Sequence, residues 1–123
     1  MILGIGTDIT EVARIAKSIE SNSFKEKVFS ATEIAYCETK VNKAESFAAR
    51  FAAKEAFFKA LGTGWRGGMA FNEVEVVNDE LGKPTLIILG TTAEIIKEKK
   101  IKTIHVSLSH VKDMAMATVI LEG

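Results

Sequence analysis

The order of hydrophobic patterns along the chain predicts an α+β fold with a largely antiparallel sheet. Alternation with a period of two predicts strands over residues 2–9, 71–77 and 85–89, because alternate side chains of a strand point to opposite faces. Two further runs, residues 103–109 and 113–121, are close enough along the chain to form a final hairpin. Helical patterns fall between these strands. The predicted order is therefore strand, helices, two strands, helix, two strands.

The shorter helical segments carry start signals. Thr10 has a side chain suited to N-cap the helix that follows the first strand. Residues 23–40 are expected to form short helical pieces, in which Ser30 and Glu33 have the spacing of a capping box. Residues 93–101 carry charged side chains on one face, which is typical of a helix with a solvated side.

Composition bounds the class of protein. At 123 residues, the chain is expected to be a single domain, residues 1–123. Lysine plus arginine number 16, as do aspartate plus glutamate, so no overall basic field indicates nucleic acid. The single cysteine, Cys37, excludes an internal disulfide and a C-x-x-C motif. With neither a membrane-length apolar run nor an N-terminal leader pattern, we expect a cytoplasmic protein.

The longest helix, from about Asn42 to Leu61, ends where Gly62 supplies a C-cap. Lys54 falls inside the apolar stripe of this helix, and Glu55 lies just beyond its edge beside Lys59. The simplest alternative is that Glu55 and Lys59 form a solvated i, i+4 pair while Lys54 extends along the aromatic side chains to water. The stripe spans an arc of about 80° and consists of Phe47, Phe51, Phe58 and Leu61.

The first strand presents one face almost without side chains. Gly4 and Gly6 lie on this face and lead to Asp8 at the strand end. Glycines within a strand often mark a close approach of a backbone or a ligand. The alternative for Asp8 is a carboxylate that only supports the turn.

Taken together, these segments resemble the holo-[acyl-carrier-protein] synthase type of 4′-phosphopantetheinyl transferase. The signature of that family is a G-x-D strand end followed, some tens of residues later, by a (W/F)-x-x-K-E-A helix. Residues 6–8 read G-T-D, residues 51–56 read F-A-A-K-E-A, and residues 107–110 read S-L-S-H, which also fits the family. The resemblance spans nearly the whole chain and implies the fold of this family.

The resemblance implies transfer of the 4′-phosphopantetheine group of coenzyme A to a serine of apo-acyl-carrier protein. The products are holo-acyl-carrier protein, for fatty acid biosynthesis, and adenosine 3′,5′-bisphosphate. Phosphoryl transfer depends mainly on positioning and on neutralising oxygen charge. Mg²⁺ suits this task and takes one or two protein carboxylates together with waters and substrate phosphates.

Asp8 and Glu55 supply that number of carboxylates, and the resemblance assigns the same two residues to Mg²⁺. A histidine and cysteine ligand set for zinc is missing. Lys54 and Lys59 are the nearest cations for the phosphates, and Lys59 is the better candidate for stabilising the leaving group. The group that takes the serine proton is left open between Glu55, a metal-bound water and no dedicated base.

Three further segments are candidates for contacting coenzyme A. Backbone N–H groups after the long helix can approach phosphate, as in anion-binding nests. The G-K-P turn resembles the adenine-side loop of the family, and the S-H segment matches a motif that contacts the 3′-phosphate in the wider superfamily. The alternatives are a plain helix cap, a plain turn and a solvated strand face. The residues concerned are Gly62, Thr63, Gly64, Lys83, Pro84, His105, Ser109 and His110.

The resemblance also implies an acidic carrier protein as partner. Arg14 matches a basic residue that the family uses on its first helix to dock the carrier. Ser21 and Phe24 stand where arginines can occur, and nearby lysines, including Lys17, are candidates to replace that charge. Such charge mainly raises the association rate and sets orientation. The alternative for Lys17 is a solvated face.

Larger, duplicated members of the superfamily carry the metal carboxylates and the S-H segment in opposite halves of one chain. A chain of this size has one such half, so the resemblance implies a homotrimer with a coenzyme A pocket at each interface. Two other functions stay open. One is a nucleotide-binding regulatory module without transfer activity. The other is a pyrophosphate hydrolase, although a helix with several glutamates is missing.

Overall fold

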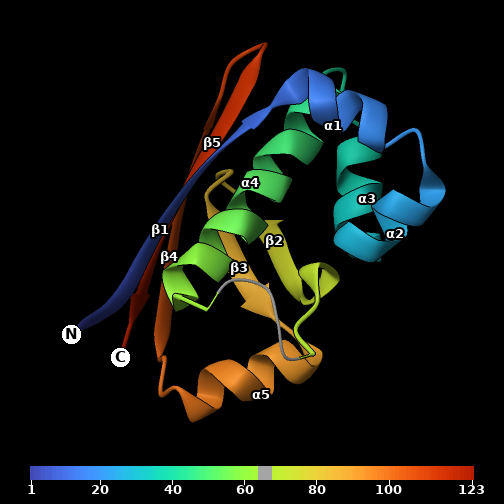
Figure 1. The fold of residues 1–123 in the computed structure, drawn as a ribbon. Helices are drawn as coiled ribbons and strands as arrows, with labels where there is room; N and C mark the ends of the chain where they lie inside the picture. Colours follow the sequence, from blue (N-terminus) through green and yellow to red (C-terminus); the bar gives the residue numbers. More distant parts are fainter. Residues whose placement is uncertain (64–67) are drawn as a thin grey trace.

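A computed structural model describes residues 1–63 and 68–123 of the chain (Figure 1). The structure confirms the predicted α+β class and the predicted order of elements. Gly64, a predicted coenzyme A contact, lies outside the described residues. The elements are β1 (Ile2–Glu11), α1 (Val12–Ser18), α2 (Asn22–Val28), α3 (Ala31–Glu38), α4 (Lys43–Leu61), the 3₁₀ helix η1 (Phe71–Glu73), β2 (Val74–Asn78), β3 (Pro84–Ile88), α5 (Gly90–Glu98), β4 (Thr103–His110) and β5 (Met114–Glu122).

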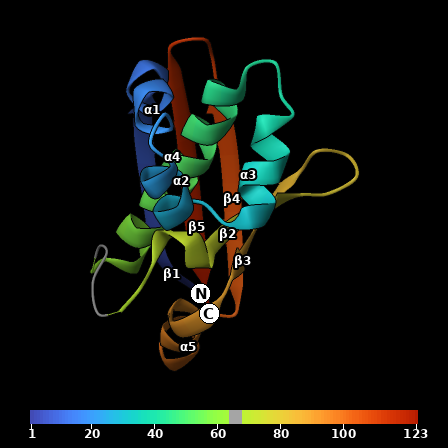
Figure 2. The ribbon, with the colours of Figure 1, turned by 90° about the vertical axis from the view of Figure 1, so that its right-hand side faces the viewer.

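The strands form two antiparallel sheets. The larger has the order β1-β5-β4, with Asp8 opposite Ala117 and Ala117 opposite Leu108, and the smaller is the β2–β3 hairpin. Figure 1 shows α4 lying along one face of the larger sheet, with α1, α2 and α3 beyond it. Figure 2 views the molecule from the side of these three helices, and the two chain ends lie close together. Helix α4 is therefore the central element of the fold.

The two glycines of β1 let the strand lie against the backbone of α4. A Cβ at Gly4 would lie 2.0 Å from the Ala60 carbonyl oxygen, and one at Gly6 would lie 2.1 Å from the Ala56 carbonyl oxygen. No side chain fits in that space. The side-chain-free face predicted from the sequence therefore meets a helix backbone.

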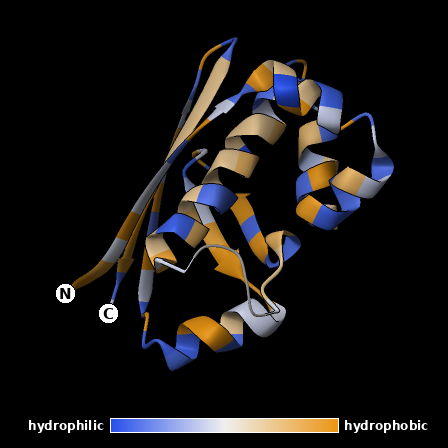
Figure 3. Cartoon of the chain, viewed as in Figure 1, coloured by the Kyte–Doolittle hydropathy of each residue, from blue (hydrophilic) through white to orange (hydrophobic). Residues whose placement is uncertain are grey.

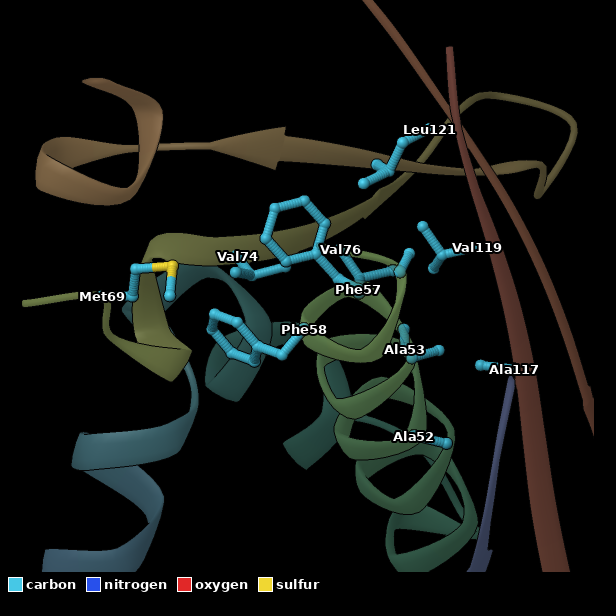
Figure 4. Close-up of a cluster of buried hydrophobic side chains, with 12 residues drawn as sticks. Ala52, Ala53, Phe57, Phe58, Met69, Val74, Val76, Ala117, Val119 and Leu121 are labelled. Atoms are coloured by element: carbon cyan, nitrogen blue, oxygen red, sulfur yellow. The ribbon is translucent and has the colours of Figure 1, made fainter. Parts of the chain in front are cut away.

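Helix α4 is buried over most of its circumference, because the sheet covers one side and the helices cover the other. In Figure 4, Ala52 and Ala53 lie near Ala117 of β5, and the rings of Phe57 and Phe58 extend toward β2. Phe29, Phe47 and Phe51 belong to a second cluster beneath α1, α2 and α3. The predicted aromatic stripe is therefore only part of the buried surface of this helix.

A buried ion pair joins α3, α4 and β2. The ammonium of Lys54 lies 2.7 Å from Oε1 of Glu33, and both side chains are 0% exposed. Lys54 also donates to the carbonyl oxygens of Phe71 (3.0 Å) and Val74, and Oε2 of Glu33 accepts from the Val76 N–H at 2.8 Å. The same Glu33 completes the predicted capping box with Ser30. All of these groups have partners, which is what makes burying two charges tolerable.

Three predicted boundaries were wrong in detail. Strand β1 continues to Glu11, because the hydroxyl of Thr10 donates to Oδ2 of Asp8 at 2.7 Å instead of capping a helix. Residues 71–73 form η1 because the Glu73 carboxylate accepts the N–H groups of Thr91 and Thr92, both at 3.2 Å. That contact starts α5 at Gly90, earlier than predicted, and the helix ends at Glu98.

Two features of the described chain bear on its class. Cys37 is buried, and burial raises the pKa of its thiol to about 11, so this group is an inert part of the core. Among the described residues, no helix is both long and apolar enough to cross a membrane.

Candidate active site

Strand β1 and helix α4 bring Asp8 and Glu55 together. Asp8 lies on the same face of β1 as Gly6, and Gly6 contacts the backbone of Ala56, the neighbour of Glu55. Burial raises the pKa of Glu55 above its ordinary value of 4.5, and the negative charge of Asp8 raises it further. The packing therefore holds two carboxylates close enough to repel each other.

Lys59 lies one helical turn after Glu55 and binds Asp8. Its ammonium donates to Oδ1 of Asp8 and to the carbonyl oxygen of Thr7, both at 3.1 Å. The Lys59 side chain is 53% exposed, whereas that of Asp8 is 13% exposed. The positive charge of Lys59 also lowers the pKa of Glu55 in part. Lys59 therefore bridges α4 to β1 and is more than a solvated partner of Glu55.

The pair has few other ligating groups around it. Among the described residues, no group of three or more histidine, cysteine, aspartate or glutamate side chains could hold a metal ion. Two carboxylates suit a magnesium ion that takes its remaining ligands from water and substrate phosphates. They do not provide the tetrahedral nitrogen and sulfur set typical of zinc.

A second polar site lies on the other side of α4. A groove of about 210 Å³ is lined by residues of α3, α4, the β2–β3 hairpin and β4. It includes the predicted contacts Pro84 and His110 together with Tyr36, Arg50 and Asn78. Lys83 precedes Pro84 in the same turn and is exposed; its backbone N–H donates to Oδ1 of Asp79 at 2.8 Å. The structure thus joins two segments that the sequence analysis treated separately.

Arg50 is the residue that sequence reasoning missed. It is only 5% exposed, its Cζ lies 4.4 Å from the centre of the Tyr36 ring, and it donates to Oδ1 of Asn78 at 2.6 Å. Its buried Nε makes no hydrogen bond among the described residues. A buried guanidinium with a spare donor is suited to an anion. The available signal was an arginine between the apolar residues Ala49 and Phe51 on a buried helix.

The three predicted coenzyme A contacts on β4 lie on two different faces of the strand. The side chain of His110 faces the groove, and its Nδ1 lies 2.9 Å from Oε1 of Glu45. His105 and Ser109 lie on the opposite face, because side chains alternate along a strand. There, Nε2 of His105 lies 2.9 Å from Oε1 of Glu122. Only His110 joins the groove of its own chain.

The end of α4 is a glycine cap. Gly62 has a φ of 81° and donates its N–H to the Lys59 carbonyl oxygen at 3.0 Å. The cap reading is confirmed, whereas phosphate binding by Gly62 and Thr63 stays a prediction. The assignment of Lys54 to phosphate needs correction, because its ammonium is enclosed by Glu33 and backbone carbonyls and cannot reach a ligand.

The predicted carrier-docking residues lie on α1 beside the carboxylate pair. Arg14 and Lys17 are both exposed, and the Arg14 guanidinium lies 5.4 Å from the centre of the Phe51 ring. The positive charge of Arg14 contributes to lowering the pKa of Glu55. The Phe24 ring centre lies 6.3 Å from that of Phe51. A basic side chain and aromatic rings thus border the site.

The outer face of the larger sheet exposes apolar side chains. Figure 3 shows hydrophobic residues along β1, one face of which no helix covers. Four apolar residues on this face are at least one-third exposed, namely Ile5 (64%), Ile9 (61%), Met114 (37%) and Met116 (43%). A contiguous apolar face of this kind is typical of an interface.

Comparison with known proteins decides the family. The sequence profile of the 4′-phosphopantetheinyl transferase superfamily matches residues 4–119. The holo-[acyl-carrier-protein] synthase of Clostridium tetani is 52% identical, over 100% of this chain and 98% of its own. That of Solibacter usitatus is 48% identical over the full length of both. The chain belongs to the holo-[acyl-carrier-protein] synthases of this superfamily. The resemblance identified from its motifs is thereby confirmed.

Solved structures of this family share the fold. The holo-[acyl-carrier-protein] synthase of Neisseria meningitidis superposes with a TM-score of 0.92 at 34% identity, covering 100% of both chains. The Bacillus anthracis enzyme in complex with CoA (3′,5′-ADP) gives 0.82 at 38% identity, covering 98% of this chain and 96% of its own. The Helicobacter pylori enzyme in complex with coenzyme A gives 0.83 at 30%, covering 96% and 99%. The family reaction is transfer of phosphopantetheine from coenzyme A to an acyl carrier protein.

Proposed function

We propose that this chain transfers the 4′-phosphopantetheine group of coenzyme A to a serine of an apo-acyl-carrier protein, using Asp8, Glu55 and Lys59. The observation that carries the proposal is the contact of β1 with α4. It places two carboxylates and one ammonium together from segments that are distant in the sequence.

Asp8 and Glu55 are the residues that would hold Mg²⁺. Their mutual repulsion, and the burial that raises the pKa of Glu55, are both relieved by a divalent cation. When bound, the ion would offset negative charge on the phosphate oxygens. The hydroxyl of Thr10 and the ammonium of Lys59 each hold one oxygen of Asp8, so its carboxylate has a fixed orientation before any ligand arrives.

The residues of the chain suit the bond changes of the reaction. The serine oxygen forms a bond to the phosphorus that carries pantetheine, and the bridging P–O bond of the pyrophosphate breaks. The electron pair of that bond stays on the 5′-phosphate of adenosine 3′,5′-bisphosphate, and the serine proton is released to water, either directly or through Glu55. Lys59 is half exposed beside Asp8 and is placed to offset the charge on the leaving phosphate.

The groove around Arg50 and His110 suits the nucleotide end of coenzyme A. Two basic side chains can meet the 3′-phosphate, while Pro84 provides an apolar surface for the adenine. Arg50 and Glu55 are five positions apart on α4, which separates them by about 140° around the helix axis. One coenzyme A molecule therefore would have to pass around α4 to reach both sites in one chain.

A neighbouring subunit removes that difficulty. We propose that the groove of one subunit and the carboxylate pair of another form one site, in a homotrimer assembled through the exposed apolar face of the larger sheet. The side chains of Ile5, Ile9 and Met116 supply the apolar surface. His105 and Ser109 lie on that same face and so would reach coenzyme A only across an interface.

Arg14 and Lys17 are proposed to dock an acidic carrier protein beside the site. Their exposure on α1 supports a basic patch, in which the Arg14 guanidinium is held over the ring of the buried Phe51. Replacing Arg14 by alanine should raise the KM for the carrier with little change in kcat, and the defect should shrink at high salt. A defect independent of salt would argue against this patch.

A transfer assay tests the proposed function. The protein is incubated with coenzyme A, Mg²⁺ and an apo-acyl-carrier protein, and mass spectrometry of the carrier follows the gain of phosphopantetheine. Omitting the carrier separates the alternatives, because a pyrophosphate hydrolase would still consume coenzyme A. A regulatory module would bind coenzyme A and leave the carrier unchanged.

A further inference from the structure

Glu45 and His110 form a carboxylate–histidine pair at the edge of the groove. Glu45 lies in the first turn of α4, and its Oε1 is 2.9 Å from Nδ1 of His110, the last residue of β4. The Glu45 side chain is 17% exposed and that of His110 is 44% exposed. The contact joins residues that are 65 positions apart, so the fold itself creates it.

The chemistry of this pair constrains the imidazole. A carboxylate only accepts hydrogen bonds, so Nδ1 of His110 must donate to Glu45. Nε2 is then the ring nitrogen left for a ligand in the groove. A phosphate oxygen also accepts only, so Nε2 can donate to phosphate when the ring carries both protons.

We propose that Glu45 is a positioning residue for substrate recognition. It accepts the Nδ1–H of His110 and so fixes the rotation of the ring, which leaves Nε2 toward the groove, where His110 and Arg50 together meet the 3′-phosphate of coenzyme A. This inference rests on the proposed placement of the nucleotide in the groove. It assigns to Glu45 a role in choosing coenzyme A over 3′-dephospho-coenzyme A, through His110 and without direct contact to substrate.

The groove itself supports this role. Arg50 is held by Tyr36 and by Asn78, and Asn78 in turn donates to the carbonyl oxygen of Gly82 at 3.0 Å. Arg50 and its neighbours are thus fixed by contacts within the chain. Glu45 does the same for His110, which is the other basic side chain lining the groove. Both basic groups are oriented before a ligand arrives, which lowers the entropic cost of binding.

A purely structural role for Glu45 is the alternative. A carboxylate in the first turn of a helix interacts favourably with the helix dipole. That role would affect stability and would not distinguish one substrate from another. The two explanations therefore predict different effects of Glu45 variants on substrate specificity.

The test measures kcat and KM for coenzyme A and for 3′-dephospho-coenzyme A in the full protein. The variants are Glu45→Gln, Glu45→Leu, His110→Ala and the double variant Glu45→Leu/His110→Ala. Glu94→Gln, which removes an exposed carboxylate on α5, is the control. Glu45→Gln keeps the size and an acceptor oxygen, so it guards against a folding defect in Glu45→Leu.

The proposal predicts that Glu45→Leu raises the KM for coenzyme A by about three- to tenfold with kcat nearly unchanged, and that Glu45→Gln has a smaller effect of the same kind. Neither should change the KM for 3′-dephospho-coenzyme A. In the His110→Ala background, Glu45→Leu should have no further effect. A Glu45 effect that persists without His110, or that is equal for both substrates, would overturn the proposal. If His110→Ala itself leaves the KM for coenzyme A unchanged, the nucleotide is not bound in this groove, and both proposals are wrong.

Discussion

The Lys59 ammonium lies 3.1 Å from Oδ1 of Asp8, although the two residues are 51 positions apart. This contact exists because β1 lies directly on the backbone of α4. A Cβ at Gly6 would be 2.1 Å from the Ala56 carbonyl oxygen and 2.6 Å from the Ala60 nitrogen. The glycine face of β1 thus sets the distance between Asp8 and Lys59, which we propose to be catalytic groups.

Replacing Gly6 by alanine should therefore damage both stability and activity. We expect a loss of about 3 kcal/mol in the free energy of unfolding, because the strand must move off the helix. Transfer should fall as Asp8 moves away from Glu55. Gly82→Ala is the control for stability, since Gly82 has a φ of 88° and nothing within 4 Å of its Cβ position. It should cost about 1 kcal/mol. Equal losses in urea denaturation would argue against close packing at Gly6.

Lys54→Met should cost about 3–5 kcal/mol, because it leaves the buried Glu33 carboxylate without its cation. Adding Glu33→Gln should restore part of that loss, since the amide removes the charge and keeps one acceptor oxygen for one of the two backbone N–H groups that Glu33 binds. Lys25→Met breaks the exposed pair with Glu38 and should cost less than about 1 kcal/mol. Chemical denaturation measures all three variants. If Lys54→Met were stable but bound phosphate poorly, Lys54 would instead be a phosphate-binding residue.

The Glu55 carboxylate should make the metal-free protein less stable as the pH rises. Its pKa is raised in the folded state, first by burial and then by Asp8. Folding therefore favours the protonated form, and that contribution is lost as the pH rises from about 4.5 through the higher folded value. Glu55→Gln should remove this dependence and, in EDTA at pH 8, gain up to about 1 kcal/mol. Urea denaturation between pH 4 and pH 8 checks this, and a variant less stable than wild type at pH 8 would contradict it.

The exposed face of the larger sheet should control assembly. Ile5→Asp places a charge on the apolar face and should give monomers with little transfer activity. Val41→Asp, at a side chain that is 99% exposed away from the sheet, should leave assembly intact. Light scattering distinguishes the two results. A fully active monomer would exclude a shared site.

Mixing inactive chains tests the same idea by function. Glu55→Ala loses one half of the proposed site and His110→Ala the other, so exchange of subunits should restore full sites at about one quarter of the interfaces. Each variant must first be shown to be defective alone. If activity stays at the level of the separate variants after exchange, both halves belong to one chain.

The fold could be predicted from the sequence because local patterns carry it, whereas the metal role of Asp8 and Glu55 stays a prediction. Alternation along β1 and the glycines before Asp8 are local signals, as is the cap at Gly62. The groove could not be predicted, because Arg50, Asn78 and His110 come from separate elements and only the fold brings them together. Lys54 was assigned wrongly because periodicity places it on a face but does not show that Glu33 covers that face.

The most direct test of the account measures transfer and metal binding in Asp8→Asn and Glu55→Gln, with Glu98→Gln as an exposed control. Phosphopantetheine transfer to the carrier is followed by mass spectrometry across a Mg²⁺ titration, and circular dichroism checks folding. The account predicts that Asp8→Asn and Glu55→Gln fold normally and transfer at least about 100-fold more slowly than wild type. Glu98→Gln should transfer at the wild-type rate, and both should require Mg²⁺. Near-normal transfer by either site variant at ordinary Mg²⁺ would contradict the claim that Asp8 and Glu55 form the metal site.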